Sequence, residues 1–113
     1  MVWNEAVAKR DYTSTEERRA GQLEHLQKTV QRVYDTVPFY RMALDERGIR
    51  PEQIKSLDDL HQLPFTTRHD LIDHYPFGLL SVPREELIRV HASSGTKGKV
   101  KIVGYTRDDI DLW

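Results

Sequence analysis

The segment that most suggests chemistry runs from His91 to Tyr105 and reads HASSGTKGKVKIVGY. It combines serine and threonine hydroxyls with lysines and with Gly95 and Gly98. Glycine allows the backbone to approach an anion closely, and successive N–H groups form a concave nest. Because each hydrogen bond to a charged oxygen contributes about 1.5–3 kcal/mol, these groups together predict a site able to hold a triphosphate.

Two familiar phosphate-binding loops are excluded by the spacing. Counting back five residues from Gly98 reaches Ser93 instead of the glycine that begins a Walker loop, and Val100 stands where Ser or Thr would bind magnesium. The segment also leads into a strand and not into a helix, so no helix dipole assists it. Only two glycines are available for a dinucleotide-binding fingerprint. A flexible loop with solvated lysines remains the alternative interpretation.

The residues around this loop predict a β-hairpin. Leu87, Ile88 and Val90 precede it, and a run of mostly β-branched and aromatic residues from Lys101 to Tyr105 follows it. His91 lies on the first strand, where a hydrogen-bonded structural histidine is the more frequent outcome than contact with substrate. Thr106 with Asp109 has capping spacing and predicts the start of a last helix over residues 108–113.

The earlier part of the chain predicts helices. Ser14 with Glu17 has the spacing of a capping box, as does Thr13 with Glu16 one residue earlier. One apolar stripe then predicts a helix over residues 15–37, formed by Leu23, Leu26, Val30, Val33, Tyr34 and Val37. Pro38 ends that helix or begins a second one, for which Gly48 is a suitable C-terminal cap.

Two shorter elements follow. Ser56 with Asp59 predicts a capped turn that carries Leu57, Leu60 and Leu63. Thr66 or Thr67 opens a third helix, in which Thr67 with Asp70 has capping spacing and which Pro76 stops.

Other candidate sites favour structural interpretations. His69, Asp70, Asp73 and His74 form i,i+4 pairs, but a five-residue spacing between the histidines does not put both on one helix face, so a solvated face is expected over a metal site. Aromatic residues beside proline and leucine are assigned to packing, with a substrate channel as the alternative: Phe39, Tyr40, Phe65, Tyr75 and Phe77.

Composition limits the protein's class. The 113 residues are 38% hydrophobic and 31% charged, which is typical of a soluble globular chain forming one domain or part of one. With 17 basic and 18 acidic residues, no basic excess supports nucleic-acid binding. No apolar run is long enough to span a membrane, no signal peptide is visible, and cysteine is absent. We expect a cytoplasmic α+β protein, helical over residues 1–85, with a hairpin and the start of a truncated helix over 86–113.

At the glycine loop the sequence resembles a known family. Ser93, Ser94, Gly95, Thr96, Gly98 and Lys99 match the phosphate-binding motif of adenylate-forming enzymes, and HASSGT before VGYT resembles the phenylacetate-CoA ligase family in particular. Residues 37–41 (VPFYR), 63–67 (LPFTT) and 75–78 (YPFG) agree in the same order, so that the resemblance covers essentially the whole chain. The chain departs from the family pattern at Lys97, usually threonine, and at Val100-Lys101, usually proline-threonine.

The resemblance implies a partial N-terminal domain of an ATP-dependent aryl-CoA ligase. In such enzymes an aromatic carboxylate reacts with ATP, and coenzyme A then displaces AMP. The six motif residues would contact the β- and γ-phosphates. The ligand for Mg²⁺, the adenine and aryl pockets and the mobile lid with its lysine would lie downstream, so that no catalytic or metal-binding residue is assigned to this chain.

Two consequences of a partial domain are expected. The chain alone should be inactive and bind ATP no tighter than about 1 mM. An unpaired hairpin edge invites a second copy of the chain, so a homodimer through residues 86–105 is predicted, with no nucleic-acid or membrane partner. The competing hypothesis is a non-catalytic helical interaction module derived from this family.

Overall fold

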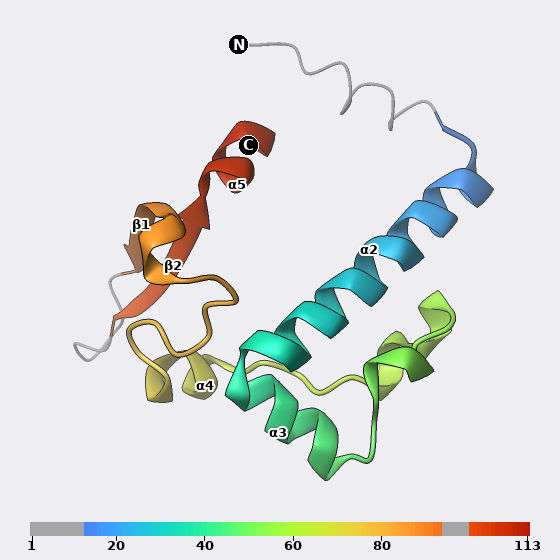
Figure 1. Ribbon diagram of the computed structural model, residues 1–113, viewed down its shortest axis with the longest axis horizontal. Coiled ribbons are helices and arrows are strands. Elements are labelled where there is room, and N and C mark those ends of the chain that lie inside the picture. The colour runs from blue at the N-terminus through green and yellow to red at the C-terminus, as the bar shows by residue number, and fades with distance from the viewer. Residues whose placement is uncertain (1–12, 94–99) are drawn as a thin grey trace.

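Helices followed by a two-stranded antiparallel hairpin form the described part of the chain. The computed structural model describes residues 13–93 and 100–113 (Figure 1). The predicted order of helices and hairpin is confirmed. The elements are α2 (Thr15–Thr36), α3 (Pro38–Glu46), η1 (Pro51–Gln53), η2 (Leu57–Gln62), α4 (Arg68–Asp73), η3 (Arg84–Glu86), β1 (Leu87–Ser93), β2 (Lys101–Thr106) and α5 (Arg107–Leu112).

Local capping sets the bounds of the first two helices. The hydroxyl of Ser14 accepts a hydrogen bond from the Glu17 N–H at 3.2 Å, so that Ser14 is the N-cap of α2. Val37 is extended and ends α2 one residue earlier than predicted, because a residue before proline avoids the helical region. Pro38 begins α3, and Gly48 has a φ of +67° just after it, which confirms the predicted glycine cap.

The hydrophobic core lies entirely in the helical part. Val30 of α2 and Leu44 of α3 pack with Ile49 and Ile54, which come from the connections around η1. Leu26, Tyr34 and Leu63 cover this cluster and are partly buried. The predicted stripe of α2 therefore faces the core, but only Val30 on the helix itself is fully buried. Val37, between the two helices, is also buried.

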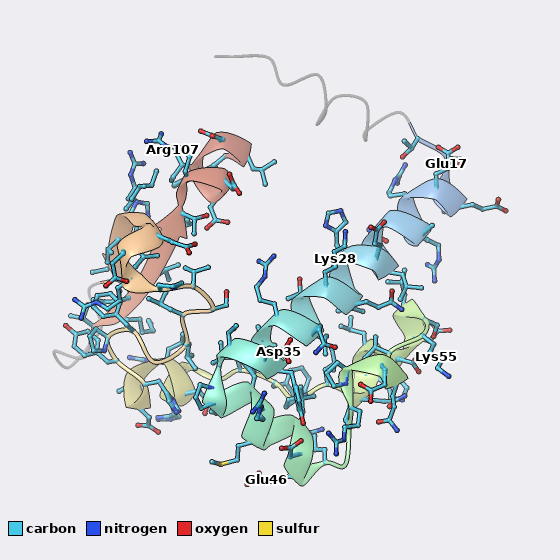
Figure 2. The ribbon with its side chains drawn as sticks, viewed as in Figure 1. Glu17, Lys28, Asp35, Glu46, Lys55 and Arg107 are labelled. Atoms are coloured by element: carbon cyan, nitrogen blue, oxygen red, sulfur yellow. The ribbon has the colours of Figure 1, made fainter. Side chains whose placement is uncertain are left out.

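Polar contacts add to this packing. The Tyr34 hydroxyl donates to Asp45 Oδ1 at 2.8 Å and accepts from Arg50 at 3.2 Å. Because the hydroxyl donates to a carboxylate, the pKa of Tyr34 is raised. The Gln27 side chain donates to the Ile54 carbonyl at 2.8 Å and so joins α2 to the end of η1. Charged side chains such as Lys28, Asp35 and Glu46 lie exposed on α2 and α3 (Figure 2).

The connection from the helices to the hairpin depends on one close approach. Helix α4 ends at Asp73, three residues before Pro76, and the Gly78 N–H donates to the His74 carbonyl at 2.8 Å. A Cβ at Gly78 would lie only 2.7 Å from that same carbonyl oxygen. Only glycine fits without moving the backbone. None of the described helices combines the length and apolar character that crossing a membrane requires.

We predict that the substitution Leu44→Ala lowers the free energy of unfolding by about 2–5 kcal/mol, because it leaves a cavity in this small core. Leu60→Ala is the matched control, since Leu60 is 57% exposed on η2 and its truncation should cost about 0.5 kcal/mol. Urea unfolding followed by circular dichroism measures both. Equal losses for the two variants would contradict the assignment of the core.

Candidate functional site

The hairpin holds the two ends of the predicted phosphate loop. Strands β1 and β2 pair antiparallel, with Ser93 opposite Lys101 at the last pair before the loop. Ser93 is exposed at this end of β1. The other five predicted contacts lie outside the described residues, and their role stays a prediction: Ser94, Gly95, Thr96, Gly98 and Lys99.

One face of the hairpin carries basic groups that lead toward the loop. Directly opposed residues share a face, so Arg89 with Tyr105, His91 with Val103, and Ser93 with Lys101 lie on the same side. Neither strand contains an acidic residue. The face therefore favours an anion at its loop end by charge. Arg89 and Lys101 were not among the predicted site residues, since only the register assigns them to this face.

Aromatic rings occupy the other end of this face. The His91 ring lies 4.8 Å from the Tyr105 ring and 5.6 Å from the Trp113 ring, measured between centroids. Tyr105 and Trp113 stack at 5.6 Å with an interplanar angle of 20°. His91 is thus held by ring contacts, and the hydrogen bond predicted for it stays a prediction. The cluster was not predicted from the sequence. Side chains of a strand alternate between its two faces, and α5 follows β2 directly, so this pattern could have indicated that Tyr105 and Trp113 lie close together.

Helix α5 is held at its start by the predicted cap. The Thr106 N–H donates to Asp109 Oδ2 at 2.9 Å, and the Asp109 N–H donates back to the Thr106 hydroxyl at 3.3 Å. This reciprocal pair begins a helix immediately after β2. The cap therefore fixes where β2 ends and where Trp113 can lie.

Asp70 of α4 and His74, which follows the helix, have structural roles. Thr67 is the N-cap, because its hydroxyl accepts from the Asp70 N–H at 3.3 Å, and Asp70 Oδ2 in turn accepts from the Thr67 N–H at 2.7 Å. The His74 Nδ1 pairs with the Asp70 carbonyl at 2.8 Å, and its ring contacts Phe39 at 4.7 Å. Within residues 13–93 and 100–113, no three His, Asp or Glu side chains gather where a metal ion could bind.

The aromatic residues divide into packed and exposed ones. Phe39 packs on Tyr40 at 5.0 Å, and the Arg84 guanidinium lies 4.4 Å from the Phe77 ring centroid. Phe65 is 88% exposed and Tyr75 is 54% exposed. The assignment to packing is therefore wrong for Phe65 and Tyr75 in the described chain.

A concavity of about 770 Å³ lies between the helical part and the hairpin. Arg32 and His74 contribute to one wall, and Glu86 and Asp109 to the other. Leucine and isoleucine side chains from α4, from the following turn and from the hairpin complete its lining. The concavity thus offers both charge signs around apolar walls.

Comparison with known proteins gives one consistent family of relatives. No protein-family model matches the chain. A phenylacetate-coenzyme A ligase of Aromatoleum evansii is 55% identical over 100 residues, covering 88% of this chain and 23% of that protein. The ligase of the same name from Thermus thermophilus is 55% identical over 98 residues, with 87% and 22% covered. That of Escherichia coli K12 is 42% identical over 113 residues, with 100% and 26% covered.

Solved structures agree with these relatives. A 2-hydroxyisobutyryl-CoA ligase in complex with 2-HIB-AMP and CoA superposes with a TM-score of 0.81 at 35% identity, over 90% of this chain and 23% of that one. The same ligase in the postadenylation state with 2-HIB-AMP gives 0.78 at 33% identity, over 90% and 22%. The chain therefore spans about a quarter of the length of the curated relatives and solved structures that it matches.

The capping carboxylate of Asp70 gives a pH-dependent prediction. Hydrogen bonds from the Thr67 N–H and hydroxyl lower the pKa of Asp70 in the folded chain. A lowered folded pKa contributes stability above the unfolded value of about 3.9, and this contribution is lost as the pH falls through the folded value. NMR titration of the Asp70 carboxyl carbon should therefore give a midpoint below about 3.9.

A variant checks the same linkage by unfolding. Asp70→Asn should lower the free energy of unfolding at pH 7, and its difference from the parent chain should shrink as the pH falls toward 2. Asp111→Asn, at an exposed aspartate of α5, is the control and should leave the pH dependence nearly unchanged. An Asp70→Asn difference that stays constant with pH would contradict the capping role.

Proposed function

We propose that this chain, which belongs to the phenylacetate-CoA ligase family, contributes the phosphate-binding loop of an ATP-dependent aryl-CoA ligase. The chain forms part of the N-terminal domain of an adenylate-forming enzyme. The 55% identity over 88% of the chain carries the proposal. The overall reaction converts phenylacetate, ATP and CoA into phenylacetyl-CoA, AMP and diphosphate.

The chemistry assigns a role to the loop. The substrate carboxylate forms a bond to the α-phosphorus of ATP while the bond to the β-phosphate oxygen breaks, so that negative charge builds on the leaving diphosphate. Donors already in place there stabilise the charge without reorganising. We assign this role to Ser93, Ser94, Gly95, Thr96, Gly98 and Lys99, with the backbone N–H groups of the glycines and the Lys99 ammonium as principal donors.

The described hairpin supports this assignment in two ways. Its register holds Ser93 opposite Lys101, so that the loop begins and ends at neighbouring backbone positions. Its basic face, with Arg89 and His91 behind Lys101, contains no carboxylate on either strand that would repel a triphosphate. Arg89 and Lys101 would add positive charge beside the proposed anion.

The remaining components of the reaction are assigned outside this chain. ATP, CoA and the aromatic acid are the proposed substrates of the complete enzyme. The described residues bring together no group of carboxylates or histidines that would hold Mg²⁺, so that we assign its ligands to the remainder of the complete enzyme. Because the chain spans about a quarter of the length of its relatives, we propose that it is inactive alone. We also propose that it acts in the cytoplasm.

The test joins this chain to the downstream part of the Thermus thermophilus ligase in place of the segment that it matches. Lys99→Ala in this hybrid should lower kcat for phenylacetyl-CoA synthesis about 10²–10³-fold, as expected for removal of one charge-stabilising donor. Lys55→Ala is the matched control, because Lys55 lies on the surface of the helical part (Figure 2). Unchanged turnover in Lys99→Ala would overturn the proposed role of Lys99, whereas a folded hybrid without activity would favour a non-catalytic helical module.

For the chain alone, we also propose pairing of two copies through the hairpin. Sedimentation velocity should give an apparent mass that rises from monomer to dimer with concentration. Val90 is 45% exposed on β1, and Val90→Lys should shift the equilibrium toward monomer, because edge lysines oppose strand pairing. Gln22→Lys on the exposed surface of α2 is the control. A monomer at every concentration would refute the dimer.

A further inference from the structure

Gly104 of β2 is covered by two leucine side chains. A Cβ at Gly104 would lie 2.9 Å from both methyl carbons of Leu87 and 3.1 Å from Cδ2 of Leu80. Carbon atoms in contact ordinarily lie about 3.5–4.0 Å apart, so the two leucines occupy the space in which a side chain at position 104 would begin. Leu80 comes from the turn after α4, and Leu87 begins β1. The bare backbone of Gly104 is therefore where this turn and the hairpin meet.

The turn that carries Leu80 is tied to the helical part. The Phe39 ring of α3 lies 4.7 Å from the His74 ring, measured between centroids. The His74 carbonyl accepts from the Gly78 N–H at 2.8 Å. In Figure 1, α2 and the hairpin lie apart, and the chain around α4 joins them. These contacts lead from α3 to the side chain that covers Gly104.

The joint between the two parts has no buried core of its own. The five buried hydrophobic residues of the described chain all lie between α2 and the end of η1, and none lies in the turn after α4 or in the hairpin. The placement of the hairpin on the helical part thus depends on a small number of contacts, among which the seat of Leu80 and Leu87 on Gly104 is the closest approach to β2.

A shift of β2 at this contact reaches the proposed phosphate loop. Strand β2 begins at Lys101, so that Gly104 lies about 10 Å along the strand from the end of the loop. Lys101 lies opposite Ser93, and Gly104 lies opposite Val90. Because hydrogen bonds join the two strands along this length, moving β2 at Gly104 moves both ends of the loop relative to the helical part.

We propose that Gly104 is a positioning residue for the formation of the acyl-adenylate. By receiving Leu80 and Leu87 it sets how closely β2 approaches the turn after α4, and so it places the loop on the leaving diphosphate. The inference rests on the proposed function, from which it takes the role of the loop. It is limited to the first step, because the acyl-adenylate that CoA attacks has lost the β- and γ-phosphates.

The experiment measures the two half-reactions separately in the hybrid with the Thermus thermophilus ligase. Phenylacetate-dependent exchange of labelled diphosphate into ATP reports adenylate formation, and supplied phenylacetyl-AMP with CoA reports thioester formation. Gly104→Val should slow the exchange about 10–10²-fold, because a misplacement of about 1 Å costs about 10²-fold, and should leave thioester formation nearly unchanged. Gly21→Val is the matched control, since a Cβ at Gly21 meets nothing within 4 Å, and both of its rates should equal those of the parent.

A compensating variant distinguishes positioning from loss of folding. Leu87→Ala removes the methyl groups that the new valine would meet, so that Gly104→Val with Leu87→Ala keeps the packed volume nearly constant, which apolar contacts tolerate best. This double variant should restore most of the lost exchange rate. Gly104→Val with Leu60→Ala should restore none of it, because Leu60 is exposed on η2.

A second variant applies where Gly104→Val does not fold. Leu80→Ala uncovers Gly104 without inserting atoms, and it should slow diphosphate exchange while thioester formation stays nearly unchanged. An exchange rate equal to that of the parent in the folded variant, or an equal loss of both half-reactions in Leu80→Ala, overturns the proposal. So does a loss in Gly104→Val that Leu87→Ala fails to restore.

Lys99→Ala separates this proposal from the proposed function. If Lys99→Ala leaves diphosphate exchange unchanged, the role of Lys99 in the loop is wrong, and the positioning role that depends on the loop loses its basis. If Lys99→Ala slows the exchange and Gly104→Val does not, the loop keeps its role and only the positioning role of Gly104 is wrong. Slowed exchange in both variants, with thioester formation retained, supports both.

Discussion

Backbone pairing between β1 and β2 is the constraint on which the candidate site depends. It sets Ser93 opposite Lys101, so that the ends of the segment between them are held about one strand spacing apart. The hydrogen bonds between the two strands thus offset the entropy lost on closing that segment, and they do so before any ligand binds. A site whose ends are already held loses less freedom on binding, which is why the register matters more here than any single side chain.

The helical part and the hairpin are not stabilised in the same way. The buried cluster of Val30, Leu44, Ile49 and Ile54 stabilises the helices, while the hairpin connects to them through α4 and the turn at Gly78. The described chain therefore combines a helical part that has its own core with a hairpin whose apolar side chains stay largely exposed. This division agrees with a partial N-terminal domain, since the chain spans about a quarter of its relatives.

The local elements could be predicted from the sequence because they depend on residues three or four apart. Ser14 caps α2, Thr67 caps α4, and Thr106 caps α5 as the spacing indicates. Longer-range contacts were not predictable in this way. Ile49 and Ile54 complete the core from connecting segments, and Phe65 is exposed although its neighbours suggest packing, because a pattern cannot say which surface another element will cover.

The residues of the candidate site likewise divide into those that local spacing predicts and those that depend on contacts between distant segments. The motif residues were identified from type and spacing, but Ser93 was predicted to lie in the loop, whereas it lies on β1 as the last residue of that strand. The accompanying Arg89 and Lys101, and the rings of His91, Tyr105 and Trp113, required the strand register and the start of α5. Charge and stacking on one face are properties of paired strands, which no single stretch of sequence contains.

The tight approach of Gly78 to the His74 carbonyl has a consequence for how this protein tolerates change. At position 78 even one methyl group meets backbone oxygen at 2.7 Å, whereas a methyl group at Gly21 meets nothing within 4 Å. In a saturation library, codon 78 should therefore accept a single amino acid and codon 21 nearly all of them. Two glycines that look alike in the sequence thus differ widely in how much substitution the fold allows.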